Sequence, residues 1–209
     1  MKVLLIVLTF ATGVYAQELM NLDDAKRAVE QFYENGTYDS LLYSTVKDAK
    51  EKIDSIELND KSAVIFDVDD TVLSGYEYSK ALGFGFTFPT WAKHLNKAEQ
   101  KAVPHMLEFY NYLKANNIRI VFLTGRDNVF YESTKRNLEK RGFTGYDTLI
   151  CRNNSEKELP ASVYKETKRK ELAEKGYSII ACVGDQESDL KGSFTGMKIK
   201  IPNYLYKIH

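Results

Sequence analysis

The sequence has little cysteine and little proline, with two Cys and four Pro among 209 residues. Two cysteines cannot form the disulfide framework of a small secreted domain, and they lack the clustered spacing of a zinc site. Cys151 and Cys182 lie in or at the end of apolar runs, where a buried thiol behaves as a small hydrophobic side chain. We therefore expect both thiols to be unpaired.

The chain also lacks an excess of charge of either sign, because Lys and Arg number 29 and Asp and Glu number 29. Balanced charge offers no general attraction to a nucleic acid polymer or an anionic membrane. Any affinity for an anion must then come from a local site. Apolar residues make up 44% of the chain, enough for a packed core, and the length suits one domain with a small insertion.

No apolar run is long enough to span a bilayer. The most apolar stretch, residues 3–10, follows the positive charge of Lys2 and precedes a small-residue cleavage pattern at Val14-Tyr15-Ala16. These features are typical of a signal peptide, which we predict at 1–16, with the domain at 17–209. An N-terminal strand is the alternative. We expect a secreted or periplasmic protein without a membrane anchor, because no cysteine near the cleavage point can carry a lipid.

Short apolar runs alternate with helical patterns along the rest of the chain, which predicts an α/β fold with a doubly wound parallel sheet. The predicted strands are 63–66, 118–123, 147–151, 178–183 and 197–201. The predicted helices between them are 103–115, 129–141 and 162–175. Two further helices within 22–55 form an N-terminal extension. Asn21 or Asp23 can cap the first, and the second has an apolar stripe of Leu42, Val46, Ala49 and Ile53.

Residues from about 74 to 100 combine glycines with many aromatic side chains, a pattern that suits neither a core element nor a solvated loop. We interpret this segment as a small cap insertion. The alternative is an ordinary insertion whose aromatic residues bury one another. Tyr76 and Trp91 are candidates for contact with the substrate, and stacking on a nucleobase would favour nucleoside monophosphates.

The strand at 63–66 ends in three carboxylates, Asp67, Asp69 and Asp70, followed by Thr71. Acidic side chains next to a buried strand are unfavourable unless they are paired or hold a cation. Convergence of Asp67 and Asp69 would create the oxygen-rich site that Mg²⁺ prefers. An acidic turn is the alternative, since Asp is common in turns.

Two more strands end in polar clusters, Thr124-Gly125-Arg126 and Gly184-Asp185 with Asp189. Ligands of a doubly wound sheet bind at the carboxyl ends of its strands. The three clusters together suit phosphoryl transfer through an aspartyl phosphate. Asp185 can bind the required cation, and the hydroxyl and amides of Thr124-Gly125 can hold phosphate oxygens. A second carboxylate two residues after the nucleophile can act as acid and base.

The motifs Asp67-Val68-Asp69-Asp70-Thr71, Leu123-Thr124-Gly125-Arg126 and Gly184-Asp185-Gln186-Glu187-Ser188-Asp189 resemble those of the haloacid dehalogenase (HAD) superfamily. The resemblance is closest to its exported acid phosphatase branch, which includes bacterial nonspecific acid phosphatases and plant vegetative storage proteins. Residues 104–113 and Tyr164-Lys165 are similar to that branch as well.

The resemblance implies a Rossmann-like HAD fold and a Mg²⁺ cofactor. Asp67 would be the nucleophile and Asp69 the general acid and base, with the backbone carbonyl of Asp69 on the metal. Thr124 would hold phosphate, with Gly125, and Lys165 would stabilise the phosphoenzyme. Asp185 would join Asp67 and Asp69 as a metal ligand. Supporting positions are Thr71, Asp189 and Arg126.

The roles of two basic residues have alternative interpretations. Lys168 lies on the same predicted helix as Lys165, although Lys165 fits the Tyr-Lys pattern of the branch. Arg126 either contacts phosphate or pairs with Asp127 or Asp70. The catalytic histidines of some phosphatases are not required by aspartate chemistry, so we expect His94 and His105 to be structural.

We therefore predict an exported Mg²⁺-dependent acid phosphatase that acts on small phosphate monoesters, with a bell-shaped pH–rate profile from the two protonation states of Asp69. A non-catalytic storage or binding protein on the same fold is the alternative, and self-association stays open. A signalling receiver domain does not place a second acid two residues after the phosphorylated aspartate. A calcium loop starting at Asp67 fails because Val72 and Tyr78 stand where it requires Gly and Glu.

Overall fold

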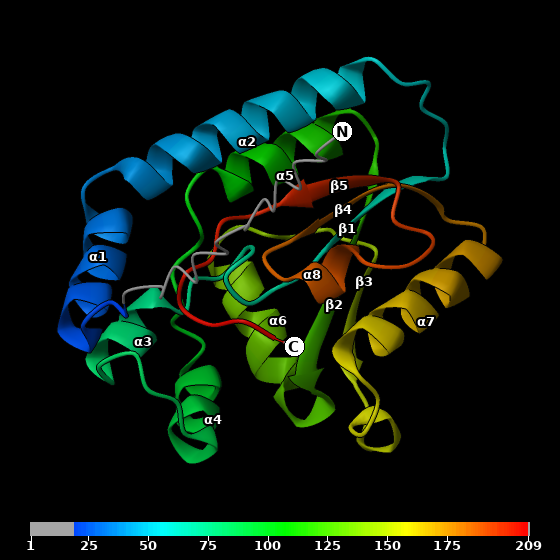
Figure 1. The fold of residues 1–209 in the computed structure, drawn as a ribbon. Coiled ribbons are helices and arrows are strands. Elements are labelled where there is room, and N and C mark those ends of the chain that lie inside the picture. The colour runs from blue at the N-terminus through cyan, green and yellow to red at the C-terminus, as the bar shows by residue number, and fades with distance from the viewer. Residues whose placement is uncertain (1–18, 209) are drawn as a thin grey trace, which may run out of the picture.

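The computed structural model describes residues 19–208, so the predicted signal peptide lies outside the described part of the chain. Its centre is a sheet of five parallel strands in the order β3-β2-β1-β4-β5 (Figure 1). The strands are β1 (Ser62–Phe66), β2 (Arg119–Asp127), β3 (Thr148–Arg152), β4 (Ser178–Gly184) and β5 (Met197–Lys200). The predicted α/β fold with a doubly wound parallel sheet is confirmed.

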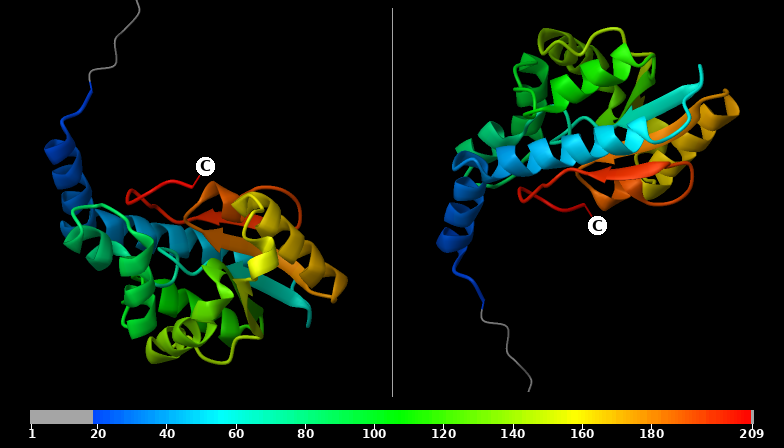
Figure 2. Two further views of the ribbon diagram at one scale, coloured as in Figure 1. Left: turned by 90° about the horizontal axis from the view of Figure 1, so that it is seen from below. Right: turned by 90° about the horizontal axis from the view of Figure 1, so that it is seen from above.

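Helices cover both faces of the sheet, which explains why its strands are almost continuously apolar. Because strand side chains alternate between faces, Val64 and Phe66 join one core with α2 (Thr37–Asp54), α5 (Met106–Ala115) and α6 (Tyr131–Lys140). Ile65 joins a second core with α7 (Ala161–Glu174) and α8 (Glu187–Leu190). Figure 2 shows α5 and α6, in green, on the opposite side of the sheet from α7.

Two helices precede β1. Helix α1 (Leu22–Glu34) begins after Asn21, whose side chain accepts a hydrogen bond of 2.9 Å from the backbone N–H of Asp23. Helix α2 buries the predicted apolar stripe together with Tyr38. This stripe packs against α5 and β5, so the N-terminal helices extend the first core along the edge of the sheet.

The segment between β1 and α5 contains two short helices, α3 (Tyr76–Ala81) and α4 (Phe88–Lys97), which lie beside α1 and below the sheet edge in Figure 1. Thr87 caps α4, and Pro89 occupies its first turn. Helix α6 holds the end of this segment through reciprocal hydrogen bonds of 2.9 Å between Gln100 and Asn137. We refer to residues 74–100 as the cap segment, although its function as a cap stays a prediction.

Several elements differ from the sequence prediction. Helix α5 begins at Met106 instead of Val103, because His105 has a φ of +61°, which is incompatible with a right-handed helix. Strand β2 continues to Asp127, which pairs with Arg152 of β3, so the polar cluster after Leu123 is part of the strand. The four-residue helix α8 and the short 3₁₀ turns η1 (Asn128–Phe130) and η2 (Asn154–Glu156) were not predicted.

Both cysteines are buried and unpaired, as the sequence predicts. Burial raises the pKa of Cys151 to about 11 and that of Cys182 to about 12, so neither thiol is a nucleophile at neutral pH. Among residues 19–208, no helix has both the length and the apolar character needed to cross a bilayer.

Candidate active site

The ends of β1 and β4 bring three aspartates together. The backbone N–H of Asp67 donates to the carbonyl of Val183 at 2.9 Å, which keeps Asp67 in register with β4 just before Asp185. Oxygen atoms of Asp67, Asp185 and Asp189 lie within 4.8 Å of one another, and all three residues are buried. This cluster includes Asp67 and Asp185, two of the residues predicted as metal ligands, and adds the side chain of Asp189, whereas the predicted contribution of Asp69 is its backbone carbonyl.

Lys165 of α7 is the cation of this cluster. Its ammonium group donates to Asp67, to Asp189 at 2.8 Å and to the carbonyl of Leu123 at 2.8 Å. Burial alone would lower the pKa of Lys165, but Asp189 and Asp67 outweigh that effect and raise it. Lys168 instead pairs with Glu156 at 2.7 Å and with Glu171. The helix therefore directs Lys165, and not Lys168, into the aspartate cluster.

The cluster is short of positive charge. When ionised, the three carboxylates outnumber the one ammonium group by two charges. One divalent cation would balance this excess of negative charge. Burial, with the neighbouring Asp189 adding, raises the pKa of Asp185 to about 6. Burial likewise raises the pKa of Asp67, despite the opposing effect of Lys165. A buried set of oxygen donors with this charge fits a hard divalent cation.

Hydrogen bonds fix the carboxylate of Asp185. Thr71 donates its hydroxyl to one oxygen at 3.1 Å and accepts the backbone N–H of Asp185 at the same distance. The other oxygen accepts from the side chains of Gln186 and Asn203, both at 2.6 Å. Thr71 thus holds the predicted supporting position, whereas Gln186 and Asn203 were not predicted.

The loop that carries Asp189 is held closely against β4. Gly184 leaves no room for a side chain, because a Cβ atom there would lie 2.3 Å from the Cβ of Asp189. Fully buried Arg169 of α7 donates to the carbonyls of Asp189, Lys191 and Ser193. Asp189 also accepts the backbone N–H of Gln186 at 2.9 Å, so its position depends on a strand, a helix and its own loop.

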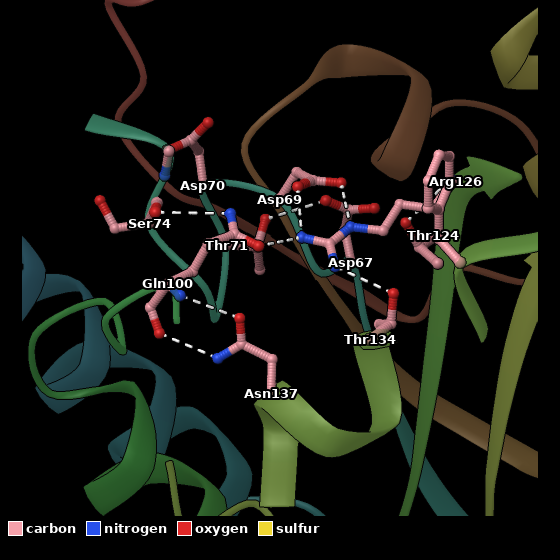
Figure 3. A network of polar contacts seen from close by, with 12 residues as sticks. Asp67, Asp69, Asp70, Thr71, Ser74, Gln100, Thr124, Arg126, Thr134 and Asn137 are labelled. Carbon is pink, nitrogen blue, oxygen red and sulfur yellow. Dashed lines mark hydrogen bonds and ion pairs between the residues drawn. The ribbon is translucent and has the colours of Figure 1, made fainter. Parts of the chain in front are cut away.

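Arg126 pairs with Asp69 and not with Asp127 or Asp70, while its contact with phosphate stays a prediction. Its guanidinium donates two hydrogen bonds to the Asp69 carboxylate, at 2.7 and 2.9 Å, and a third to Thr134 at 2.9 Å (Figure 3). Asp127 pairs with Lys157, and Asp70 accepts from the backbone of Gly75. The Asp69 side chain is 19% exposed and that of Arg126 only 2%, so the carboxylate is the accessible member of the pair.

Thr124 and Gly125 follow on β2. Thr124 is fully buried, and its hydroxyl accepts the backbone N–H of Arg126 at 3.1 Å. Its carbonyl accepts the hydroxyl of Tyr164 at 3.2 Å. Gly125 is exposed and lines a cavity, whereas Thr124 does not. The structure therefore brings the backbone at Gly125 to the surface that a ligand can reach.

That cavity has a volume of about 340 Å³ and joins the aspartate cluster to the cap segment. Its polar end contains Asp67, Asp69, Lys165 and Asp189. Its walls are mostly aromatic and come from three parts of the chain: Tyr78, Phe86 and Trp91 of the cap segment, Tyr164 of α7, and Tyr206 beyond β5. A cavity of this size and composition suits a small molecule that combines an anionic end with an apolar end.

The two predicted cap residues have different positions. Trp91 lines the cavity, whereas Tyr76 stacks on Tyr33 with ring centroids 4.6 Å apart and donates its hydroxyl to Glu34. Tyr76 lies outside the cavity lining because Tyr33 and Glu34 of α1 contact its ring and its hydroxyl. Arg152, the last residue of β3, and Tyr206, in the irregular segment after β5, also line the cavity and were not predicted.

The sequence of residues 4–209 matches a family model described as HAD superfamily, subfamily IIIB (acid phosphatase). The chain belongs to this family. The predicted resemblance to the HAD superfamily and its acid phosphatase branch is thus confirmed, and the geometry above is that of a subfamily IIIB protein.

Several plant members of the family are similar to the chain. It is 35% identical over 159 residues to the stem 28 kDa glycoprotein of Glycine max, which covers 73% of this chain and 63% of that protein. It is 30% identical to vegetative storage protein 1 of Arabidopsis thaliana, over 94% of this chain and 76% of that protein. It is 31% identical to acid phosphatase 1 of Solanum lycopersicum, covering 77% and 66%. The alignments with the stem glycoproteins span only 53–63% of those relatives.

The fold matches a solved structure as well. The class C acid phosphatase from Bacillus anthracis, solved with tungstate bound, superposes with a TM-score of 0.75 over 89% of this chain and 86% of that one. The two sequences are 24% identical. This similarity supports the fold assignment of the subfamily IIIB chain.

Proposed function

We propose that this protein is a Mg²⁺-dependent phosphomonoesterase that works through an aspartyl phosphate on Asp67. The observation that carries the proposal is the buried cluster of Asp67, Asp185 and Asp189 with Lys165, placed at the polar end of an accessible cavity. Membership of a family that includes acid phosphatases supports the same reaction.

Asp67, Asp185 and the backbone carbonyl of Asp69 would hold the metal, with Asp189 close by. When bound, the cation would offset the negative charge that the phosphate and the carboxylates share. Lys165 donates to the Asp67 carboxylate and so orients it toward the cavity. The backbone at Gly125 is the exposed part of β2 that can donate to phosphate oxygens.

In the first step an oxygen of Asp67 forms a bond to phosphorus, and the bond to the ester oxygen breaks. Asp69 gives its proton to the departing oxygen, so an alcohol or phenol leaves. In the second step water attacks the phosphorus of the aspartyl phosphate and passes a proton to Asp69, which releases phosphate and restores Asp67. The two hydrogen bonds from Arg126 hold Asp69 in place for both transfers.

The aromatic walls favour substrates whose leaving group is a flat ring. Tyr78 and Trp91 pack together at a centroid distance of 4.9 Å, and Phe86 lies next to Trp91. An aryl phosphate carries its ring directly on the ester oxygen and a nucleoside monophosphate carries its base beyond the sugar, and Trp91 rather than Tyr76 is placed to contact either ring.

The decisive experiment compares the full chain with Asp67→Asn in the hydrolysis of p-nitrophenyl phosphate, with Mg²⁺ and with chelator. We expect Asp67→Asn to lower kcat by at least about 1,000-fold, because no other group can form the covalent intermediate. Asp60→Asn makes the same change at an exposed turn and serves as the control. Chelation should have a similar effect to the active-site variant and should be reversed by Mg²⁺.

Retained turnover in Asp67→Asn would reject the nucleophile, and metal-independent turnover would reject the cofactor. An unreactive wild-type protein that still binds Mg²⁺ in calorimetry would favour the storage or binding alternative. The presence of a vegetative storage protein among its relatives supports that alternative.

We further propose that residues 1–16 direct export and are removed. The support is the order of positive, apolar and small residues at the start of the sequence. N-terminal sequencing of the protein recovered outside the producing cell should begin at Gln17, and recovery with Met1 retained would contradict the proposal.

A further inference from the structure

Arg152 is a second basic feature of the cavity, separate from the aspartate cluster. It ends β3, and its guanidinium lies 4.7 Å from the ring centroid of Tyr164 while donating to the carbonyl of Leu159 at 2.9 Å. These two contacts fix the plane of the guanidinium against one wall of the cavity. Its position is therefore set without any acidic partner.

The other cations that line this cavity are already neutralised. Lys165 lies between Asp67 and Asp189, and both nitrogens of Arg126 that face Asp69 are bonded to it. Within residues 19–208, Arg152 has no carboxylate within 4.0 Å, and its buried Nε has no hydrogen-bond partner. Nearby acids are engaged elsewhere, since Glu156 pairs with Lys168 and Asp127 with Lys157.

Arg152 lines two adjoining cavities, and only one of them is also lined by the nucleophile. A second cavity, of about 410 Å³, adjoins the first and shares Phe86, Trp91, Gly125, Arg126 and Arg152 with it. None of Asp67, Lys165 or Asp189 lines this second cavity. A group that contacts Arg152 from the shared region would belong to the leaving group of a bound ester and not to the transferred phosphate.

We propose that Arg152 binds an anionic substituent on the leaving group, so that the preferred substrates are aromatic phosphate monoesters with a carboxylate or second phosphate on the ring. This proposal rests on the proposed phosphatase function. A fixed guanidinium with free N–H groups is suited to both kinds of anion, because it can donate two parallel hydrogen bonds. The aromatic walls between it and Asp67 would hold the ring.

The test measures kcat/KM for phenyl phosphate, for 4-carboxyphenyl phosphate and for the same ring with a 4-phosphonate in place of the carboxylate. The wild-type protein should favour the substituted esters over phenyl phosphate. Arg152→Met keeps an unbranched chain against Tyr164 but removes the charge, and it should reduce that preference by about ten-fold, the effect of one hydrogen bond to a charged group. Comparison of the two substituted esters identifies which anion the site prefers.

Arg119→Met is the matched control, because Arg119 also lies over a tyrosine ring, that of Tyr177, at the opposite end of the sheet. Arg119→Met should leave the ratio of kcat/KM between the substituted esters and phenyl phosphate unchanged. Arg152→Lys should restore part of the preference and so separate charge from packing.

Equal losses for all three esters in Arg152→Met would overturn the proposal and assign Arg152 to the transferred phosphate. An unchanged ratio would overturn it in favour of a structural role. No turnover of phenyl phosphate by the wild-type protein is a different result, because it rejects the proposed function itself. Calorimetric titration with 4-hydroxybenzoate then tests Arg152 alone, and equal affinity in wild type and Arg152→Met would overturn the site.

Discussion

The two ends of the cavity are built in different ways. At the strand ends, Asp67, Lys165 and Asp185 are all less than 8% exposed and are tied together by hydrogen bonds that cross from one element to another. In the cap segment, Phe86 is 66% exposed and Phe88 57%, and their contacts are mainly with other aromatic rings. The charged end of the cavity is thus held by hydrogen bonds between elements, whereas the aromatic end is held by packing between rings.

This difference predicts how each region tolerates change. A buried charge that loses its partner is strongly unfavourable, so the strand-end cluster cannot vary one residue at a time. The cap segment is anchored at both ends, by Tyr76 on α1 and by Arg141, which donates to the carbonyls of Glu99 and Gln100. Its cavity-lining aromatic residues can change without disturbing those anchors, and substrate preference can therefore vary while the reaction stays the same.

The largest expected effect on stability comes from Lys165→Met. Removing the ammonium group leaves Asp67 and Asp189 buried without a cation, which should lower the free energy of unfolding by about 3–5 kcal/mol in the absence of metal. Denaturant unfolding in chelator measures this change. Lys168→Met, one turn along the same helix, should lower it by less than about 1 kcal/mol, because its ion pairs are partly solvated. Equal losses of unfolding free energy in the two variants would show that the buried ion pairs of Lys165 contribute no more to stability than those of Lys168.

A moderate effect on specificity is expected from Trp91→Ala. Loss of the ring should reduce kcat/KM for p-nitrophenyl phosphate about three- to ten-fold relative to glycerol phosphate, because only the aryl ester has a ring to stack. Tyr43→Ala removes an exposed aromatic residue of α2 and is the control. A parallel loss for both esters would mean that Trp91 supports the reaction centre and not the substrate wall.

The smallest effect concerns His94, which stacks on Trp91 at a centroid distance of 5.4 Å. Burial, with Arg126 adding, lowers the pKa of His94 below its ordinary value. The unfolded chain therefore binds a proton more readily, and the stability contributed by neutral His94 above about pH 6.5 is lost as the pH falls through the folded pKa. We expect the fluorescence of Trp91, the only tryptophan, to change over that acidic range.

His94→Gln should remove this fluorescence transition, whereas His105→Gln should retain it, because His105 stacks on Tyr43 instead. A transition that persists in His94→Gln would assign the titration to another group.

Much of the fold could be predicted from the sequence, because apolar strands and amphipathic helices leave regular patterns. The aspartates after β1 and β4 were predictable for the same reason, since parallel strands place their carboxyl ends together. The choice between Lys165 and Lys168 was not fixed by periodicity, because it depends on how α7 rotates against the sheet. The pairing of Arg126 with Asp69 also joins residues 57 positions apart, so only the folded chain reveals it.

Residues outside regular patterns were the hardest to predict. Asn203, which donates to Asp185, and Tyr206, which lines the cavity, follow β5 in a segment without helix or strand. Arg152 lies one residue beyond the strand predicted at 147–151, and no sequence pattern singles it out. Tyr76 seemed equivalent to Trp91 in an aromatic segment, and only the neighbouring α1 separates their positions.

Helix α7 has a consequence for the order in which the protein assembles. Lys165 and Arg169 lie one turn apart, and they hold the Asp67 carboxylate and the loop after Asp189. Lys165 is synthesised 98 residues after Asp67. During synthesis, the Asp67 carboxylate must therefore stay hydrated until α7 is available, because Arg126, the cation made earlier, pairs with Asp69 instead. Docking of this one helix therefore supplies both the counter-charge of Asp67 and the support of the Asp189 loop.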